Sequence, residues 1–166
     1  LYTVKALECI RKADCMIYDQ LIDNRILKEV KAGCELIYAG KKAHNHAIPQ
    51  EEMNALLVEK SKEYDTVVRL KGGDACVFGR GGEEGQALYD AGVDFEVVPG
   101  LSSVMAGLAY AGIPITHRGL ANSFCVYTGV LAKDTMRDFC FEEIYLVYPE
   151  VEEMIRKDGK DISLAE

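Results

Sequence analysis

The sequence predicts an α/β domain with a largely parallel β-sheet and helices on both faces of that sheet. Short apolar runs that suit buried strands alternate, at least three times, with longer segments that carry apolar residues at helical spacing. The connections between these segments are short. Strands that alternate with helices in this way typically lie parallel, because each helix returns the chain to the edge of the sheet where the previous strand began.

The chain is expected to begin with a helix and a strand. Thr3 can cap a helix that runs to Arg11, in which Val4 and Leu7 begin an apolar stripe beside charged residues. The apolar run Cys15–Tyr18 follows and is typical of a short strand.

A second helix and a second strand are expected next. Asp19 stands directly beyond the first strand, and residues 22–30 carry apolar side chains at helical spacing before Gly33, which favours the end of a helix. Glu35–Tyr38 has the composition of a strand, and Gly40–Lys41 stands directly beyond it.

The middle of the chain repeats this order. Gln50–Glu63 is a helix by its apolar period, and the β-branched run Thr66–Leu70 is expected to be a buried strand. A further helix is expected to begin at Glu83 and to end at Gly92. Phe95–Val98 is expected to be a strand, and the small residues of Ser103–Ala111 are expected to form a helix.

Four polar or glycine-rich segments follow the expected strands. They are Asp19, Gly40–Lys41, Gly72–Asp74 and Pro99–Ser102. In a parallel sheet the carboxyl ends of the strands meet at one edge, and open α/β sheets bind their ligands at that edge. The sequence therefore predicts a single cleft that is lined by all four segments.

The glycine-rich stretch 66–84, TVVRLKGGDACVFGRGGEE, carries the strongest local signal. Gly72 and Gly73 would let the backbone turn sharply and approach a ligand, while Asp74 would supply a carboxylate. The pattern matches neither G-x-G-x-x-G nor G-x-x-x-x-G-K-[ST], the two common phosphate loops. From the residues alone, a tight strand-to-helix connection without a ligand stays an alternative.

Composition excludes several classes of function. The 166 residues carry a formal net charge of −8, which argues against general nucleic-acid binding because that needs a dense cationic face. The sequence contains no apolar run of membrane-spanning length and begins with no signal-peptide core, so we expect a cytoplasmic protein without a membrane partner. The six cysteines form no C-x-x-C pair and are expected to be free, buried thiols; a zinc site would need ligand spacing that the sequence lacks.

Two domains are expected. Residues 1–120 would form the amino-terminal α/β domain, and residues 121–166 would form part of a second α/β domain that begins with a strand at Ser123–Thr128.

Several motifs in order resemble one known family. The stretch 66–84 resembles the signature of the uroporphyrinogen-III C-methyltransferases of the tetrapyrrole methylase family, in which GGD is followed by proline, an aromatic residue and VFGRGGEE. Here Ala75–Cys76 replaces the proline and the aromatic residue. The resemblance extends to the segments YDQL at 18–21, GKKAHNH at 40–46, FEVVPG at 95–100 and AYAGIPITHR at 109–118. Both ends of the chain depart from the family pattern, which favours a fragment or a sequence from which loops are missing.

The resemblance implies a reaction and its participants. Methyl groups would pass from S-adenosyl-L-methionine, which becomes S-adenosyl-L-homocysteine, to carbons 2 and 7 of uroporphyrinogen III, giving precorrin-2 for sirohaem and cobalamin. No metal is implied, and family members are commonly homodimers. The alternatives are a methyltransferase that acts on a later precorrin and a nucleotide-binding module without catalysis.

The resemblance also implies roles for single residues. Asp19 matches the proposed proton acceptor and Lys41 the proposed proton donor, although Asp19 could instead cap a helix and Lys41 could be an exposed lysine. The residues that match the family's contacts to the cofactor are Gly72, Gly73, Asp74, Val77, Ser102 and Ser103.

An acidic protein that binds a polycarboxylate macrocycle needs a local group of cations. Arg80 and Arg118 could hold substrate carboxylates through bidentate hydrogen bonds, and Glu83 could orient Arg80 or a pyrrole NH. Lys41, Lys42, His44 and His46 in one loop are further candidates.

Overall fold

The computed structural model describes residues 1–40 and 48–126. The chain divides into two compact units, Leu1–Val126 and Tyr127–Glu166, and the second unit lies outside the described residues. The expected domain boundary between residues 120 and 121 stays a prediction.

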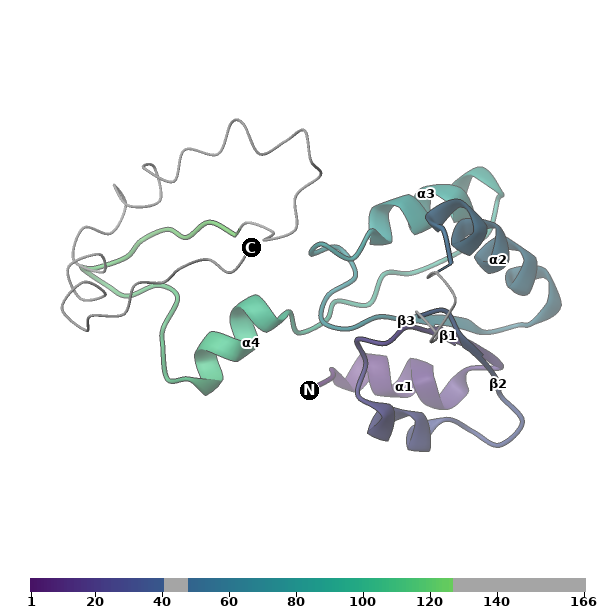
Figure 1. The fold of residues 1–166 in the computed structure, drawn as a ribbon, viewed down its shortest axis with the longest axis horizontal. Coiled ribbons are helices and arrows are strands. Elements are labelled where there is room, and N and C mark those ends of the chain that lie inside the picture. Colours follow the sequence, from purple (N-terminus) through teal and green to yellow (C-terminus); the bar gives the residue numbers. More distant parts are fainter. Residues whose placement is uncertain (41–47, 127–166) are drawn as a thin grey trace. The chain divides into compact units, whose positions relative to one another are not determined.

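The first unit contains a three-stranded parallel sheet in the order β2-β1-β3, which confirms the predicted fold class (Figure 1). Tyr18 is paired with Tyr38 on one side and with Leu70 on the other, so the three strands end at the same level. The segments that follow the strands therefore leave the sheet from one edge. The strands are β1 (Cys15–Tyr18), β2 (Glu35–Tyr38) and β3 (Val67–Leu70).

Helices cover both faces of this sheet, as predicted (Figure 1). On one face Met16 packs with Ile10 and Ala13, and on the other face Cys15 and Ile17 pack with residues of α2. These side chains alternate because successive residues of a strand point to opposite faces. The helices are α1 (Val4–Lys12), the 3-10 helix η1 (Asn24–Glu29), α2 (Gln50–Glu63), α3 (Gly81–Asp90) and α4 (Ser103–Tyr110).

The predicted cap of the first helix is confirmed. The Thr3 hydroxyl oxygen accepts a hydrogen bond from the Ala6 amide at 3.2 Å, which satisfies one of the amide groups that lack a partner at a helix start. Helix α2 has the predicted bounds, and its buried residues Met53 and Leu57 are one turn apart.

The α-helix expected over residues 22–30 is wrong. The structure has a 3-10 helix at Asn24–Glu29, and the Asp23 carboxylate accepts a hydrogen bond from the Arg25 amide at its start. Only its apolar residues Ile26 and Leu27 pack against the sheet, and none of its residues is fully buried. A segment this short, with so little buried surface, suits the tighter 3-10 turn.

The strand expected at Phe95–Val98 is also wrong, because this segment pairs with no strand among the described residues. Its Phe95 ring lies against α3, where a Cβ atom at Gly85 would be 3.2 Å from the ring. Residues 123–126 of the strand expected at Ser123–Thr128 are exposed and form no strand, and residues 127 and 128 lie outside the described part.

The cysteines of the described residues are free thiols, as predicted: Cys9, Cys15, Cys34, Cys76 and Cys125. The expectation that these thiols are buried is right for Cys15 and wrong for Cys76 and Cys125, which are exposed. Within residues 1–40 and 48–126, every helix is too short or too polar to cross a membrane.

Candidate functional site

The three segments that leave the sheet beyond β1, β2 and β3 are in close contact. A Cβ atom at Gly40 would lie 2.9 Å from the Gln20 amide nitrogen and would also overlap the Tyr38 hydroxyl. A Cβ atom at Gly72 would lie 2.5 Å from the Leu21 carbonyl oxygen. Glycine is required at both positions because the backbone after β1 lies directly against the two neighbouring loops.

The loop after β3 also lies against the segment that leads into α4. A Cβ atom at Gly100 would overlap the Gly73 carbonyl oxygen and would lie 3.0 Å from the Asp74 Cα atom. The Asp74 carboxylate accepts hydrogen bonds from the amides of Gly100 at 2.9 Å and Cys76 at 2.8 Å. These bonds, the one from Gly100 first, lower the pKa of Asp74 below its usual value. The structure thus brings Gly72, Gly73 and Asp74 together with Ser102.

These residues could hold the methionine part of S-adenosylmethionine, the co-substrate that the family resemblance implies. The Asp74 carboxylate has about four acceptor positions, of which two hold backbone amides, so it can still accept from an ammonium group. Ser102 precedes the first turn of α4, yet its side chain does not cap that helix. Its hydroxyl, that of Ser103 and the helix amides can donate to a carboxylate. Val77 is 41% exposed beside them, and its amide donates to the Asp74 carbonyl.

Asp19 lies at a pocket of about 460 Å³, which Arg69, Gln20, Gln50 and Met53 also line. One Asp19 carboxylate oxygen accepts a hydrogen bond from the Leu21 amide at 3.0 Å, and the other accepts one from the Arg69 guanidinium at 3.3 Å. Asp19 therefore fixes its own loop and caps none of the described helices.

A group of buried charges behind Asp19 was not predicted from the sequence. The Arg69 Nε atom donates to Glu84 at 3.2 Å, and the Lys71 ammonium donates to both oxygens of Glu84, at 2.9 and 3.1 Å. The sequence does carry a signal for such a group of charges. Arg69 interrupts the apolar run TVVRL, in a strand that helices cover on both faces. A charge in such a strand needs a buried partner.

Arg80 and Glu83 pair with each other at the start of α3. The guanidinium donates to both carboxylate oxygens, at 2.8 and 2.7 Å, and this pairing lowers the pKa of Glu83. Both side chains are more than half exposed. Arg80 has a φ angle of 57°, in the left-handed region.

The remaining predicted residues are not placed in the site. Arg118 is exposed between the bridged residues His117 and Ala121, and it has no hydrogen-bond or ion-pair partner among the described residues. The predicted proton donor, Lys41, lies outside the described residues, as do Lys42, His44 and His46.

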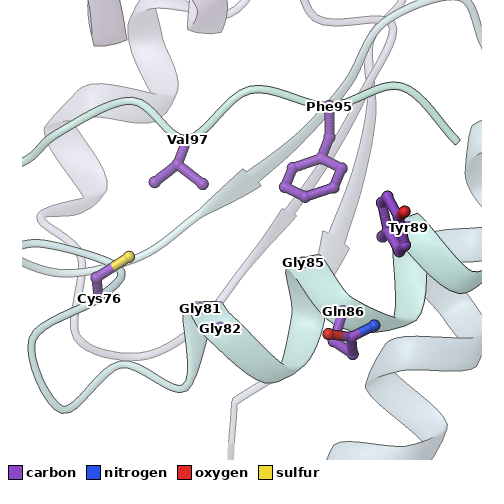
Figure 2. Close-up of a pocket in the computed structure, with 8 residues that line it drawn as sticks. All are labelled: Cys76, Gly81, Gly82, Gly85, Gln86, Tyr89, Phe95 and Val97. Atoms are coloured by element: carbon purple, nitrogen blue, oxygen red, sulfur yellow. The ribbon is translucent and has the colours of Figure 1, made fainter.

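A second pocket, of about 290 Å³, lies between α3 and the segment that contains Phe95 and Val97. Figure 2 shows that the side chains of these two residues point toward the glycine-rich start of α3. Its lining contains no carboxylate and no cationic side chain. The pocket at Asp19 is therefore the candidate site for proton transfer.

Comparison with protein families gives one match that covers nearly the whole chain. The model of the tetrapyrrole (corrin/porphyrin) methylases matches residues 1–158.

Curated relatives are similar over most of the chain. It is 51% identical, over 134 residues, to a uroporphyrinogen-III C-methyltransferase of Methanocaldococcus jannaschii, a match that covers 81% of this chain and 55% of the relative. It is 49% identical to a siroheme synthase of Hahella chejuensis, covering 81% of this chain and 29% of the relative. The chain thus spans about half the length of the first of these relatives.

Solved structures are similar in fold as well as in sequence. A uroporphyrin-III C-methyltransferase from Thermus thermophilus, complexed with S-adenyl homocysteine, is 46% identical with a TM-score of 0.60, and the match covers 73% of this chain and 49% of that one. A cobalt precorrin-4 methyltransferase is 33% identical with a TM-score of 0.59, over 69% of this chain and 46% of that one.

Proposed function

The chain belongs to the tetrapyrrole methylase family, and on this premise we propose that its protein is a methyltransferase that methylates carbons 2 and 7 of uroporphyrinogen III to give precorrin-2. The observation that carries the proposal is the identity of 51% with a relative named for this reaction, against 33% with a cobalt precorrin-4 methyltransferase. Because the chain spans about half the length of that relative, the proposal concerns the whole protein.

S-adenosylmethionine, when bound, supplies a methyl group that its positively charged sulfur has already activated. The pyrrole carbon forms a bond to the methyl carbon, the sulfur keeps the electron pair of the broken bond, and the ring takes over the positive charge. The ring becomes neutral again when it loses a proton. We propose that the Asp19 carboxylate at the pocket accepts this proton.

The methionine part of S-adenosylmethionine would lie at the loop after β3 and the start of α4. Asp74 would accept from the ammonium group, and Ser102 and Ser103 would donate to the carboxylate. Gly72, Gly73 and Val77 would line the site, and glycine at position 72 also leaves room for the Leu21 carbonyl oxygen. The contacts between Asp74 and Gly100, and between Gly73 and Ser102, support this arrangement.

The carboxylates of uroporphyrinogen III need cations at the rim of the site. We assign this role to Arg80, oriented by Glu83, and to Arg118, and we keep Lys41 as the proton donor. The bidentate pairing of Arg80 with Glu83 supports a fixed orientation of the guanidinium. The homodimeric state and the cytoplasmic location stay predictions.

Anaerobic incubation of the full-length protein with S-adenosylmethionine and uroporphyrinogen III tests the proposal. Oxidation of the product, followed by absorbance and mass spectrometry, should show two added methyl groups. Methylation only of a later precorrin would favour the alternative methyltransferase. Binding of S-adenosylmethionine in calorimetry without any turnover would leave a nucleotide-binding module.

A further inference from the structure

The guanidinium of Arg69 lies between two carboxylates that come from different elements of the fold. It donates to Asp19, beyond the end of β1, at 3.3 Å and to Glu84, in the first turn of α3, at 3.2 Å. Arg69 itself is on β3, paired in register with Ile17 of the neighbouring strand. The charged bridge therefore connects the rim of the pocket to the sheet and to α3, a helix that packs against α2.

The hydrogen bonds of Arg69 leave little capacity for a substrate. Arginine has five N–H donors, and in Arg69 four bonds go to protein atoms: the two carboxylates and the carbonyl oxygens of Ile17 and Leu70. Its side chain is 15% exposed although it lines the pocket. A guanidinium that is held in this way acts on neighbouring protein groups and is poorly suited to bind the carboxylates of a ligand.

Glu84 and Lys71 complete the group behind Arg69. The side chain of Glu84 is 6% exposed and that of Lys71 is 11% exposed, so both charges are largely removed from water. Asp19 and Glu84 carry two negative charges against the two positive charges of Arg69 and Lys71. Burying charges is costly unless they are paired, and here each is paired.

We propose that Arg69 is a positioning residue for Asp19, and that Glu84 holds Arg69 in the required place. This inference rests on the proposed role of Asp19 as proton acceptor. The Leu21 amide holds one carboxylate oxygen of Asp19 and Arg69 holds the other, so the side chain has one fixed orientation at the pocket. A proton acceptor held in place works faster than one that samples several rotamers.

A double-mutant cycle tests this inference with Arg69→Gln, Asp19→Asn and the two changes combined. Arg69→Gln should lower kcat by roughly 10- to 100-fold, because a small displacement of a reacting group has such an effect. The Michaelis constant for uroporphyrinogen III and the Kd of S-adenosylhomocysteine should stay within about twofold of the unchanged protein. In the Asp19→Asn background, Arg69→Gln should have no further effect on kcat.

Lys60→Met is the matched control, because the Lys60 side chain is 14% exposed, close to the 15% of Arg69, and also pairs with a carboxylate on the same unit, that of Glu35, which is 40% exposed. Neither Lys60 nor Glu35 lines the pocket at Asp19. Lys60→Met should lower the denaturation midpoint without lowering kcat. Arg69→Lys keeps the positive charge beside Glu84 and should restore part of kcat. If Arg69→Gln does not fold, Arg69→Lys takes its place in the double-mutant cycle.

The outcomes separate the two proposals. Absence of methyl transfer by the unchanged protein would contradict the proposed function. Two results would overturn the positioning role alone, provided that the unchanged protein transfers methyl groups normally. One is an unchanged kcat in Arg69→Gln, and the other is a further loss of kcat when Arg69→Gln is added to Asp19→Asn. Crystal structures provide a readout that does not depend on activity, and Asp19 should lose its single rotamer in Arg69→Gln.

Discussion

The carboxylate of Asp74 accepts a hydrogen bond from the amide of Gly100, 26 residues further along the chain, at 2.9 Å. This bond joins the loop after β3 to the segment that begins α4, and it lies where Gly73 and Gly100 are in direct backbone contact. One side chain therefore links two segments that we propose to bind the same ligand.

This link should make stability depend on pH. The bonds from Gly100 and Cys76 lower the pKa of Asp74 in the folded protein below its usual 3.8, so they stabilise the fold fully above that value. As the pH falls from about 3.8 through the lower pKa of the folded state, this contribution is lost. Urea unfolding of the unchanged protein and of Asp74→Asn should give a constant difference in unfolding free energy near neutral pH that shrinks in acid. A difference that does not vary with pH would contradict this.

Gly100→Ala should strongly destabilise the unit. The added Cβ atom would meet backbone atoms of Gly73 and Asp74, which cannot move aside as a flexible side chain would. We expect a loss of about 1–3 kcal/mol of unfolding free energy and weaker binding of S-adenosylhomocysteine. The control is Gly107→Ala in α4, where a Cβ atom meets nothing within 4 Å and alanine favours the helix by up to about 1 kcal/mol. Equal effects of the two changes would argue against the close contact.

Arg80 allows charge and backbone conformation to be tested separately. Arg80→Ala and Arg80→Gly both remove the guanidinium and should raise the Michaelis constant for uroporphyrinogen III while the affinity for S-adenosylhomocysteine stays near normal. Only glycine fits the φ angle of 57° without strain, so the glycine variant should be more stable than the alanine variant by about 1 kcal/mol. An unchanged kcat/KM in both variants would remove Arg80 from the substrate site.

Ser102→Ala should weaken ligand binding without weakening the helix. Removing a side chain that caps a helix usually costs about 1 kcal/mol, but the Ser102 side chain does not cap α4. Calorimetry should therefore show an affinity for S-adenosylhomocysteine reduced by about tenfold, the equivalent of one hydrogen bond, while the melting temperature stays the same. Ser103→Ala is the parallel measurement, and it tells which hydroxyl contacts the ligand. A lower melting temperature with normal affinity would assign Ser102 a structural role instead.

The strands of the sheet and their parallel direction could be predicted because they follow from local signals. Apolar runs such as Cys15–Tyr18 define strands. The four segments expected at one edge do contact one another, but the predicted single cleft is wrong, because the pocket at Asp19 is lined by Asp19 and Gly40 and by no residue of 72–74 or 99–102. Gly72 was predicted to let the backbone approach a ligand, whereas in the structure the Leu21 carbonyl oxygen lies against it.

The two elements that were predicted wrongly depend on which residues lie next to them in the folded chain. The segment Phe95–Val98 has the composition of a strand, but the Phe95 ring packs on α3. The short helix η1 has too little buried surface to continue as an α-helix.

The two carboxylates of the candidate site could be predicted from the sequence, but the ion pairs behind them could not. Asp19 stands directly after β1, and Asp74 stands in the glycine-rich loop four residues after the end of β3, so position alone indicates a role for both. The pairing of Arg69 with Glu84 joins a strand to a helix 15 residues away, and no local pattern specifies which buried charges will meet.

Among residues 1–40 and 48–126, Asp19 and Asp74 share no hydrogen-bond partner: Leu21 and Arg69 hold the first, and Cys76 and Gly100 hold the second. The two loops touch where the Leu21 carbonyl oxygen lies against Gly72, but a substitution that removes a hydrogen-bond partner of one carboxylate should leave the hydrogen bonds of the other in place. During evolution, a protein built in this way can exchange the part that we propose to receive the macrocycle and keep unchanged the part that we propose to hold the methyl donor.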